Sequence, residues 1–218
     1  MPSLRDERAP ADGDEGEAFE FTADWFSAAE PTWRAIFQQL IPDARKILEI
    51  GCYEGRSVVW LIKNGFRRGM AGDLYCIDNW KGSVEHSSAT MQDVFARFKR
   101  NVERAYKAAP AITVHRLEAD SRPALAKLYL EGHGGSFDFV YVDASHQAPD
   151  VLSDLVLAFE LCRVGGIVAC DDYLWNFGRN PLHTPKIAID AFVNCYAAKL
   201  TPVSGVPLYQ FFFKKIAA

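Results

Sequence analysis

Acidic residues follow several of the short apolar runs in this sequence, and their carboxylates are the first groups that could do chemistry. Each run is typical of a buried strand, and each ends at or beside an acid. In an open sheet of parallel strands, the carboxyl ends lie along one edge, and ligands bind there. Carboxylates gathered at that edge could accept hydrogen bonds from hydroxyl groups or hold a cation. The acids in question are Glu49, Asp78, Asp120, Asp143 and Asp171.

The first of these runs is followed by a glycine-containing turn and then by a helical pattern. The apolar stretch 46–50 contains Glu49 and stops at Gly51, and the helical pattern starts after Gly55. Such a strand–turn–helix unit directs backbone N–H groups into an open crevice. A dinucleotide site would need a further glycine between the two, and an acid beside the turn would repel a pyrophosphate. The turn therefore favours a positively charged ligand over a nicotinamide dinucleotide.

The elements that must position these acids alternate along the chain as strand and helix. This order predicts an α/β fold with a doubly wound, mostly parallel sheet of seven strands. The last strand follows a short turn instead of a helix, so we expect it to be antiparallel. The expected strands are 46–51, 72–78, 111–117, 137–143, 167–172, 200–203 and 207–214, and the expected helices are 56–63, 90–108, 123–130, 151–162 and 186–198, with a turn at 163–166.

The N-terminal part of the chain differs in composition from the rest. Residues 1–18 are rich in Asp, Glu, Gly and Pro, and we expect an acidic, disordered tail. Residues 19–44 carry aromatic side chains at helical spacing, and we expect a helical segment that packs on the α/β domain of residues 45–218 or covers it as a lid. Because the acids concentrate near the N-terminus, the remaining chain is near neutral, and no nucleic-acid partner is expected.

The cysteines and the hydropathy of the sequence indicate in which cellular compartment the protein is expected. Five cysteines are spread through the chain without a C-x-x-C pair, which predicts buried free thiols in a reducing environment. No apolar run approaches the roughly 20 residues of a membrane span, and the acidic N-terminus lacks the features of a signal peptide. We therefore expect a cytoplasmic protein with no membrane partner.

The first turn and the acids after it resemble one large enzyme class. The pattern E-x-G-x-x-x-G at residues 49–55, with Asp78 at the end of the second strand, resembles the class I S-adenosylmethionine-dependent methyltransferases. The resemblance implies that residues 45–218 form a Rossmann-like methyltransferase domain. It also implies that Asp78 holds the ribose hydroxyls of the cofactor and that Asp120 lies near its adenine. The implied cofactor-binding residues are Glu49, Gly51, Cys52, Tyr53, Gly55, Ser57, Asp78, Asn79, Trp80, Asp120, Ser121 and Asp143.

A narrower resemblance carries a metal site with it. Tyr53 and Ser57 stand where catechol O-methyltransferase-like enzymes have a tyrosine and a serine in the first loop. Those enzymes hold a divalent metal between an acid that ends strand four and acidic or amide side chains that end strand five. The matching positions here are Asp143, Asp171 and Asp172, and oxygen ligands favour Mg²⁺, Mn²⁺ or Ca²⁺ over zinc.

The loop after the fourth strand resembles the D-G-x-H signature of a bacterial family of small-molecule O-methyltransferases that includes cephalosporin-biosynthesis methyltransferases. In this sequence the loop reads Asp143-Ala-Ser-His146, so Ala144 replaces the glycine, and the geometry of the loop departs from the family pattern there. The resemblance implies that His146 and Asp143 are the catalytic pair, with His146 as the base. Further agreement lies in residues 25–26, 54–57, 171–173 and 188–192.

The function that these residues predict is the S-adenosylmethionine-dependent O-methylation of a small-molecule hydroxyl with the help of a divalent metal. Two alternatives on the same fold remain open: a metal-independent methyltransferase with His146 as base, and a non-catalytic protein that binds S-adenosylmethionine or another nucleoside. The expected partner is a small-molecule acceptor. The aromatic segment 19–44 could pack on its own domain or across a homo-oligomer.

Overall fold

The computed structural model describes residues 18–82, 86–176 and 180–218. The tail predicted at residues 1–18 lies, apart from its last residue, outside this part of the chain. The described residues form one sheet of seven strands in the order β3-β2-β1-β4-β5-β7-β6. Strands β1 to β5 are parallel, and β7 is antiparallel to β5 and to β6, as predicted. The strands are β1 Lys46–Ile50, β2 Gly72–Asp78, β3 Ile112–Glu118, β4 Phe137–Val142, β5 Cys162–Cys170, β6 Leu200–Pro202 and β7 Phe211–Lys215.

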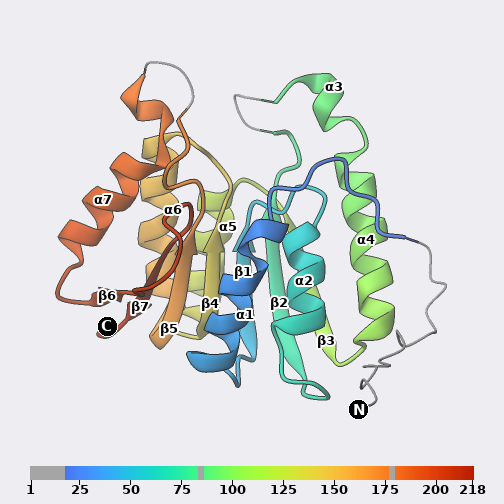
Figure 1. Ribbon diagram of the computed structural model, residues 1–218, viewed down its shortest axis with the longest axis horizontal. Coiled ribbons are helices and arrows are strands. Elements are labelled where there is room, and N and C mark those ends of the chain that lie inside the picture. The colour runs from blue at the N-terminus through green and yellow to red at the C-terminus, as the bar shows by residue number, and fades with distance from the viewer. Residues whose placement is uncertain (1–17, 83–85, 177–179) are drawn as a thin grey trace, which may run out of the picture.

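Helices cover both faces of the sheet, and each face has its own hydrophobic core (Figure 1). Helices α1, α2 and α4 pack on one face, and α5, α6 and α7 pack on the other. This double cover explains why all six residues of β4 are buried, since a strand between two helical layers has no solvent side. The helices are α1 Glu30–Gln39, α2 Arg56–Asn64, α3 Ser88–Met91, α4 Val94–Ala108, α5 Ser121–Leu128, α6 Ala148–Leu161 and α7 Pro185–Cys195, with short turns η1 Ser27–Ala29, η2 Tyr129–His133 and η3 Pro181–His183.

Three local predictions were wrong, each for a backbone reason. The helix expected at 90–108 is divided into α3 and α4, because Asp93 adopts a left-handed conformation with φ of 62°. The turn expected at 163–166 belongs to β5, where Gly165 has φ of 85° and the pairing with β4 shifts in register as in a β-bulge. Helix α6 starts before residue 151, with a proline in its first turn.

A segment before α1 runs from the outer helix layer to the carboxyl end of the sheet, and we call residues 18–26 the N-terminal strap. The buried Asn101 of α4 accepts the N–H of Glu20 and donates to the carbonyl of Glu20. Glu54 in the loop after β1 accepts the backbone N–H and the hydroxyl of Thr22 at 2.6 and 2.8 Å. It also accepts the guanidinium of Arg97 at 2.5 Å. The strap is therefore tied to the loop after β1 and to α4 at the same time.

No helix within residues 18–82, 86–176 and 180–218 combines the length and the hydropathy needed to cross a membrane.

Candidate functional site

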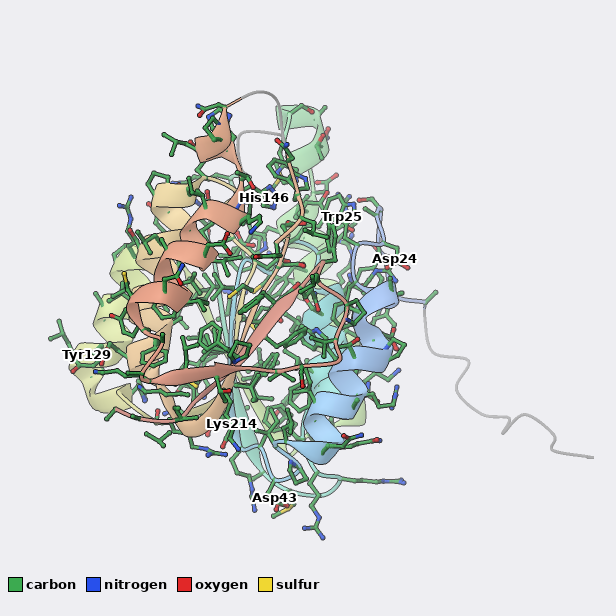
Figure 2. All side chains as sticks on the ribbon, turned by 60° about the vertical axis from the view of Figure 1, so that its left-hand side comes forward. Asp24, Trp25, Asp43, Tyr129, His146 and Lys214 are labelled. Atoms are coloured by element: carbon green, nitrogen blue, oxygen red, sulfur yellow. The ribbon has the colours of Figure 1, made fainter. Side chains whose placement is uncertain are left out.

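A cavity of about 1090 Å³ opens at the carboxyl end of the parallel strands. The loops after β1 to β5 line it, and Trp25 and Phe26 close one side. Figure 2 shows Trp25 and His146 toward the same end of the molecule, with Asp43 and Lys214 toward the opposite end. The carboxyl ends of the strands therefore converge on one cavity, as expected from the positions of the acids. Four of the five predicted rim acids line it: Asp78, Asp120, Asp143 and Asp171.

Gly51 brings two of the lining loops into contact. A Cβ atom on Gly51 would lie 2.0 Å from the carbonyl oxygen of Asp143, and the residue has φ of 85°. Only glycine meets both conditions at low cost, because it has no Cβ and tolerates positive φ. Gly51 and Gly55 were predicted as parts of the turn, and Gly55 also has a positive φ, 80°. The loop after β1 is thus pressed against the loop after β4.

Non-glycine residues with positive φ concentrate around the cavity. Tyr53, Trp80 and Asp172 have φ of 47°, 51° and 55°. Each follows a strand of the parallel sheet closely, and Tyr53 and Asp172 line the cavity. Such conformations carry strain and persist where the surroundings impose them, which often happens in functional sites.

Glu49 lies behind the wall of the cavity, where no solvent reaches it. Ser57, which lines the cavity, donates its hydroxyl to Oε1 of Glu49 at 2.5 Å. Oε2 of Glu49 makes no hydrogen bond to any residue that the structure describes. Burial raises the pKa of this carboxyl to about 8. Because Ser57 uses its proton on Glu49, its oxygen can accept a hydrogen bond from a cationic group in the cavity.

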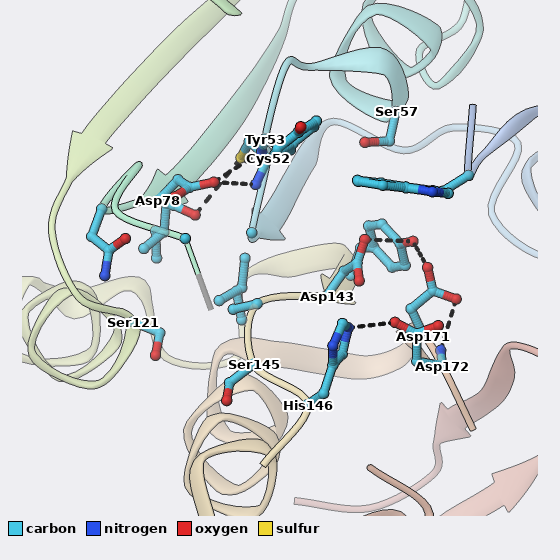
Figure 3. A pocket seen from close by; sticks show the side chains of 18 of the residues that line it. Cys52, Tyr53, Ser57, Asp78, Ser121, Asp143, Ser145, His146, Asp171 and Asp172 are labelled. Carbon is cyan, nitrogen blue, oxygen red and sulfur yellow. Dashed lines mark hydrogen bonds and ion pairs between the residues drawn. The ribbon is translucent and has the colours of Figure 1, made fainter. Parts of the chain in front are cut away.

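Asp78 holds the first loop in place. Its Oδ2 accepts the N–H groups of Cys52 and Tyr53 at 2.8 and 2.9 Å, and its Oδ1 accepts the N–H of Trp80 at 2.7 Å. An ionised carboxylate has roughly four acceptor positions. Asp78 therefore retains acceptor capacity toward the cavity beside its structural bonds (Figure 3).

Of the residues predicted to bind the cofactor near the end of β2, some line the cavity and Trp80 is packed in the core. Asn79 donates its amide to Asp120 Oδ1 at 2.8 Å, and both line the cavity together with Ser121. Trp80 is not among the described residues that line it. Its indole is 8% exposed, packs on an aromatic side chain of α4 with ring centroids 4.8 Å apart and donates to the carbonyl of Tyr53 at 2.9 Å. Trp80 supports the loop from beneath.

Asp143, His146 and Asp172 form a compact group at the other end of the cavity (Figure 3). One ligand atom from each lies within 4.8 Å of those of the other two, and His146 Nε2 is 2.6 Å from Asp172 Oδ2. The pKa of Asp143 is raised well above its usual range, first by burial and then by the neighbouring charges of Asp171 and Asp172. Two carboxylates and an imidazole at this separation fit a divalent cation, whose charge would relieve the repulsion.

Asp171 was predicted as a metal ligand beside Asp143 and Asp172, but it lies outside this group. Its Oδ2 accepts the hydroxyl of Tyr141 at 2.5 Å, and its Oδ1 accepts the N–H of Asp172 at 2.9 Å. Burial, with the charge of Asp172, raises its pKa to about 6. The described residues that come together are Asp143, His146 and Asp172, and a metal contact of Asp171 stays a prediction.

Two tyrosines that the sequence analysis missed contact the acids. Tyr141 donates to Asp171 and lies 3.1 Å from Asp143 Oδ2, and Tyr209 donates to Asp172 Oδ1 at 2.7 Å. Tyr141 could have been found as a polar-tipped residue two positions before a rim acid. Tyr209 carries no such signal, because 37 residues separate it from its partner.

Comparison with known proteins agrees with the fold. A family model described as "Methyltransferase domain" matches residues 48–173, from β1 through the loop after β5. Caffeoyl-CoA O-methyltransferase 1 of Eucalyptus globulus is 37% identical over 150 residues, which are 69% of this chain and 53% of that protein. Caffeoyl-CoA O-methyltransferase of Eucalyptus gunnii has the same identity, with 52% of its length covered. The chain spans about half the length of these curated relatives.

Solved structures share the fold. An O-methyltransferase from Bacillus cereus, in complex with SAH, superposes with a TM-score of 0.61 at 22% identity, covering 88% of this chain and 82% of that one. A putative O-methyltransferase from Klebsiella pneumoniae gives 0.59 at 19% identity, with 90% and 83% covered. The MycE methyltransferase of the mycinamycin biosynthetic pathway, in complex with Mg and SAH, gives 0.57 at 17% identity, with 89% and 51% covered.

Proposed function

The chain belongs to the methyltransferase-domain family, and from that premise we propose that it is an S-adenosylmethionine-dependent O-methyltransferase for a small-molecule hydroxyl. The observation that carries the proposal is one cavity with two chemically different ends. At one end, Asp78 and Ser57 offer acceptors for a cationic nucleoside. At the other end, Asp143, His146 and Asp172 form a group suited to a cation and to proton transfer.

The cofactor end has acceptors for each part of S-adenosylmethionine. Asp78 is assigned to the ribose hydroxyls, because a carboxylate accepts two such bonds well. Asp120 and Ser121 are assigned to the adenine, since they line the cavity next to Asp78 through the contact with Asn79. Ser57, backed by Glu49, is assigned to the positively charged amino-acid end. The relatives support this assignment, because the Bacillus cereus and MycE structures contain SAH.

We assign a divalent cation, Mg²⁺ or Mn²⁺, to Asp143, His146 and Asp172. When bound, the cation lowers the pKa of a neighbouring hydroxyl and so makes it a better nucleophile. The donor set supports this choice, because two carboxylates and one imidazole lie within reach of one ion. The Mg in the MycE structure is consistent with it.

In the metal-independent alternative, His146 is assigned the proton of the acceptor hydroxyl, because Nε2 cannot bind a cation and take a proton at the same time. Its Nδ1 is buried, whereas its Nε2 faces the acidic group. The imidazole is held between Asp172 and the ring of Trp175, whose centroid is 4.2 Å away. An imidazole that is fixed in this way can take a proton at neutral pH.

The N-terminal strap reaches the cavity beside the first loop. Trp25 packs against Tyr53 of the first loop with ring centroids 5.0 Å apart, so the strap forms part of the cavity wall. Methyl transfer needs two aligned and desolvated reactants more than it needs covalent help from the protein, and we assign the strap to shielding them. We further propose that the protein works in the reducing cytoplasm, which its five free cysteines support.

The test begins with binding. Calorimetry with S-adenosylhomocysteine should give one saturable site, and Asp78→Asn should weaken it, whereas Asp43→Asn at the opposite end should not. A screen with S-adenosylmethionine labelled in its methyl group should then reveal transfer to a hydroxyl compound, among caffeoyl-CoA, catechols and sugars. Binding without transfer to any acceptor, together with indifference to Asp143→Ala, would instead favour a non-catalytic role. Full transfer in the presence of EDTA would remove the metal from the proposal.

A further inference from the structure

A chain of buried hydrogen bonds connects helix α1 with the acidic end of the cavity. Trp33 of α1 donates its indole N–H to Oε1 of Gln210 at 2.8 Å. Gln210 donates from Nε2 to the hydroxyl oxygen of Tyr141 at 3.2 Å. Tyr141 in turn donates to Asp171 at 2.5 Å and lies 3.1 Å from Asp143. Residues from α1, from the approach to β7 and from β4 thus meet behind the carboxylates.

The donor and acceptor groups of these side chains allow the series of hydrogen bonds to run in one direction only. An indole N–H can only donate, so Gln210 must turn its carbonyl oxygen toward Trp33. The amide nitrogen of Gln210, which also can only donate, then points at Tyr141. The hydroxyl oxygen of Tyr141 is occupied as an acceptor, and its one proton is directed to Asp171, with Asp143 Oδ2 3.1 Å away. Every donor in the chain therefore points toward the acids.

Burial protects this direction. Trp33, Tyr141 and Gln210 are 0%, 2% and 5% exposed. This burial leaves the amide of Gln210 few other partners, and a reversed amide would set two N–H donors against each other. The ring of Tyr141 is held as well, because Trp33 packs edge-on against it with centroids 4.7 Å apart.

We propose that Tyr141, oriented by Gln210 and Trp33, is a positioning residue for the divalent cation at Asp143, His146 and Asp172. Its hydroxyl fixes how the Asp143 carboxylate is turned and binds Asp171 next to the group. The inference rests on the proposed function, since it assumes that this group holds a cation. It adds helix α1, outside the matched family domain, to the parts that shape the site.

The test measures the affinity for Mn²⁺ by electron paramagnetic resonance, with the full chain saturated with S-adenosylhomocysteine. Tyr141→Phe keeps the ring and removes the hydroxyl, and it should weaken Mn²⁺ binding roughly 10- to 100-fold, the usual effect of losing a partner of a ligand. Gln210→Met removes the donor that orients the phenol and should cause a smaller loss. Tyr129→Phe, on the exposed turn η2, is the matched control and should bind Mn²⁺ as the wild type does.

The double variant shows whether the residues act in series. If Gln210 acts through Tyr141, the double variant should lose no more affinity than Tyr141→Phe alone. If the losses of Mn²⁺ affinity add, Gln210 does not act through Tyr141, and the proposal is overturned. The affinity for S-adenosylhomocysteine of each variant is measured in parallel and should stay close to the wild type, because neither residue lies at the cofactor end. The melting temperature shows that each variant folds, and it should fall because each substitution leaves a buried polar atom without its partner.

The outcomes separate this inference from the proposed function. A folded Tyr141→Phe that binds Mn²⁺ normally would overturn it. If Tyr141→Phe does not fold, Gln210→Met decides, and unchanged Mn²⁺ affinity in that variant would overturn it equally. A wild type that binds S-adenosylhomocysteine but no Mn²⁺ would also overturn it and leave the methyl-transfer proposal standing. A wild type that binds neither would overturn the proposed function itself.

Discussion

Ser57 donates its hydroxyl to the buried carboxyl of Glu49 across 2.5 Å, and Ser57 alone of the two faces the cavity. In the proposed function, a ligand that contacts Ser57 therefore affects the ionisation of Glu49 without touching it. Burial keeps Glu49 protonated in the free protein up to a pH of about 8, whereas the usual pKa is 4.5. A positive charge beside Ser57 favours the ionised form.

Binding of S-adenosylmethionine at pH 7 should therefore release close to one proton. Calorimetry in two buffers of different ionisation enthalpy measures this release. Glu49→Gln has no proton to release there and should lose the buffer dependence, whereas Glu118→Gln, an exposed acid at the end of β3, should keep it. Equal release from wild type and Glu49→Gln would contradict the assignment.

Asp154 of α6 should lower the stability of the protein as the pH rises. Its carboxyl is 1% exposed, and its oxygens form no hydrogen bond within the described part of the chain. Burial raises its pKa to about 6, and the nearby Ser121 opposes this shift only in part. The native protein keeps a proton that the unfolded chain loses between about pH 4 and 6, so stability falls across that window by up to about 3 kcal/mol.

Asp154→Asn removes this titration and should flatten the fall of the melting temperature between pH 4 and 6.5. Glu160→Gln, exposed on the same helix, should leave the fall unchanged. A steeper or equal slope in Asp154→Asn would show that the carboxyl is satisfied in solution.

Glu54 should control both stability and access to the cavity. Its side chain is 2% exposed and binds Thr22 of the strap and Arg97 of α4. Glu54→Ala leaves a largely buried guanidinium without its carboxylate, which costs about 3 kcal/mol or more. Denaturant unfolding measures this loss, and stopped-flow release of S-adenosylhomocysteine should become faster because the strap is untied. Glu103→Ala, whose ion pair on α4 is exposed, should change stability by less than about 1 kcal/mol and leave release unaltered.

His146→Asn should lower turnover by roughly 10²- to 10⁴-fold while S-adenosylhomocysteine still binds, as expected on removal of a general base. His115→Asn is the control, because His115 pairs with Asp73 away from the cavity. Normal turnover in His146→Asn would exclude the base. A matching loss of Mn²⁺ affinity would show that the imidazole serves the cation instead.

The sequence predicted those parts of the fold and site that depend on local pattern. Asp143, His146 and Asp172 were found because each lies within a few residues of a strand end, and the order of strands and helices fixes where those ends meet. The break at Asp93 was missed because the apolar pattern of a helix continues across it. Trp80 was predicted to contact the cofactor, and the structure packs its indole against α4 beneath the loop. An aromatic residue after a strand can turn to a ligand or to the core, and the residue type does not tell which.

Contacts between distant segments were beyond sequence reasoning. Tyr209 and Gln210 are consecutive residues just before β7, yet Gln210 binds Tyr141 and Tyr209 binds Asp172. Their roles depend on the register in which β7 pairs with β5, and the residue types do not reveal that register.

The contact of Gly51 with the carbonyl of Asp143 has a consequence for how such an enzyme can diversify. The loop after β1, which we propose receives the methyl donor, and the loop that carries the acidic group approach each other through main-chain atoms at Gly51. In that proposal, the backbone sets the spacing between the two reactants. The outer wall, with Trp25 and Trp175, can change without altering that spacing. Substitutions in this wall could then fit a different acceptor, while the backbone keeps the distance between the methyl donor and the acidic group.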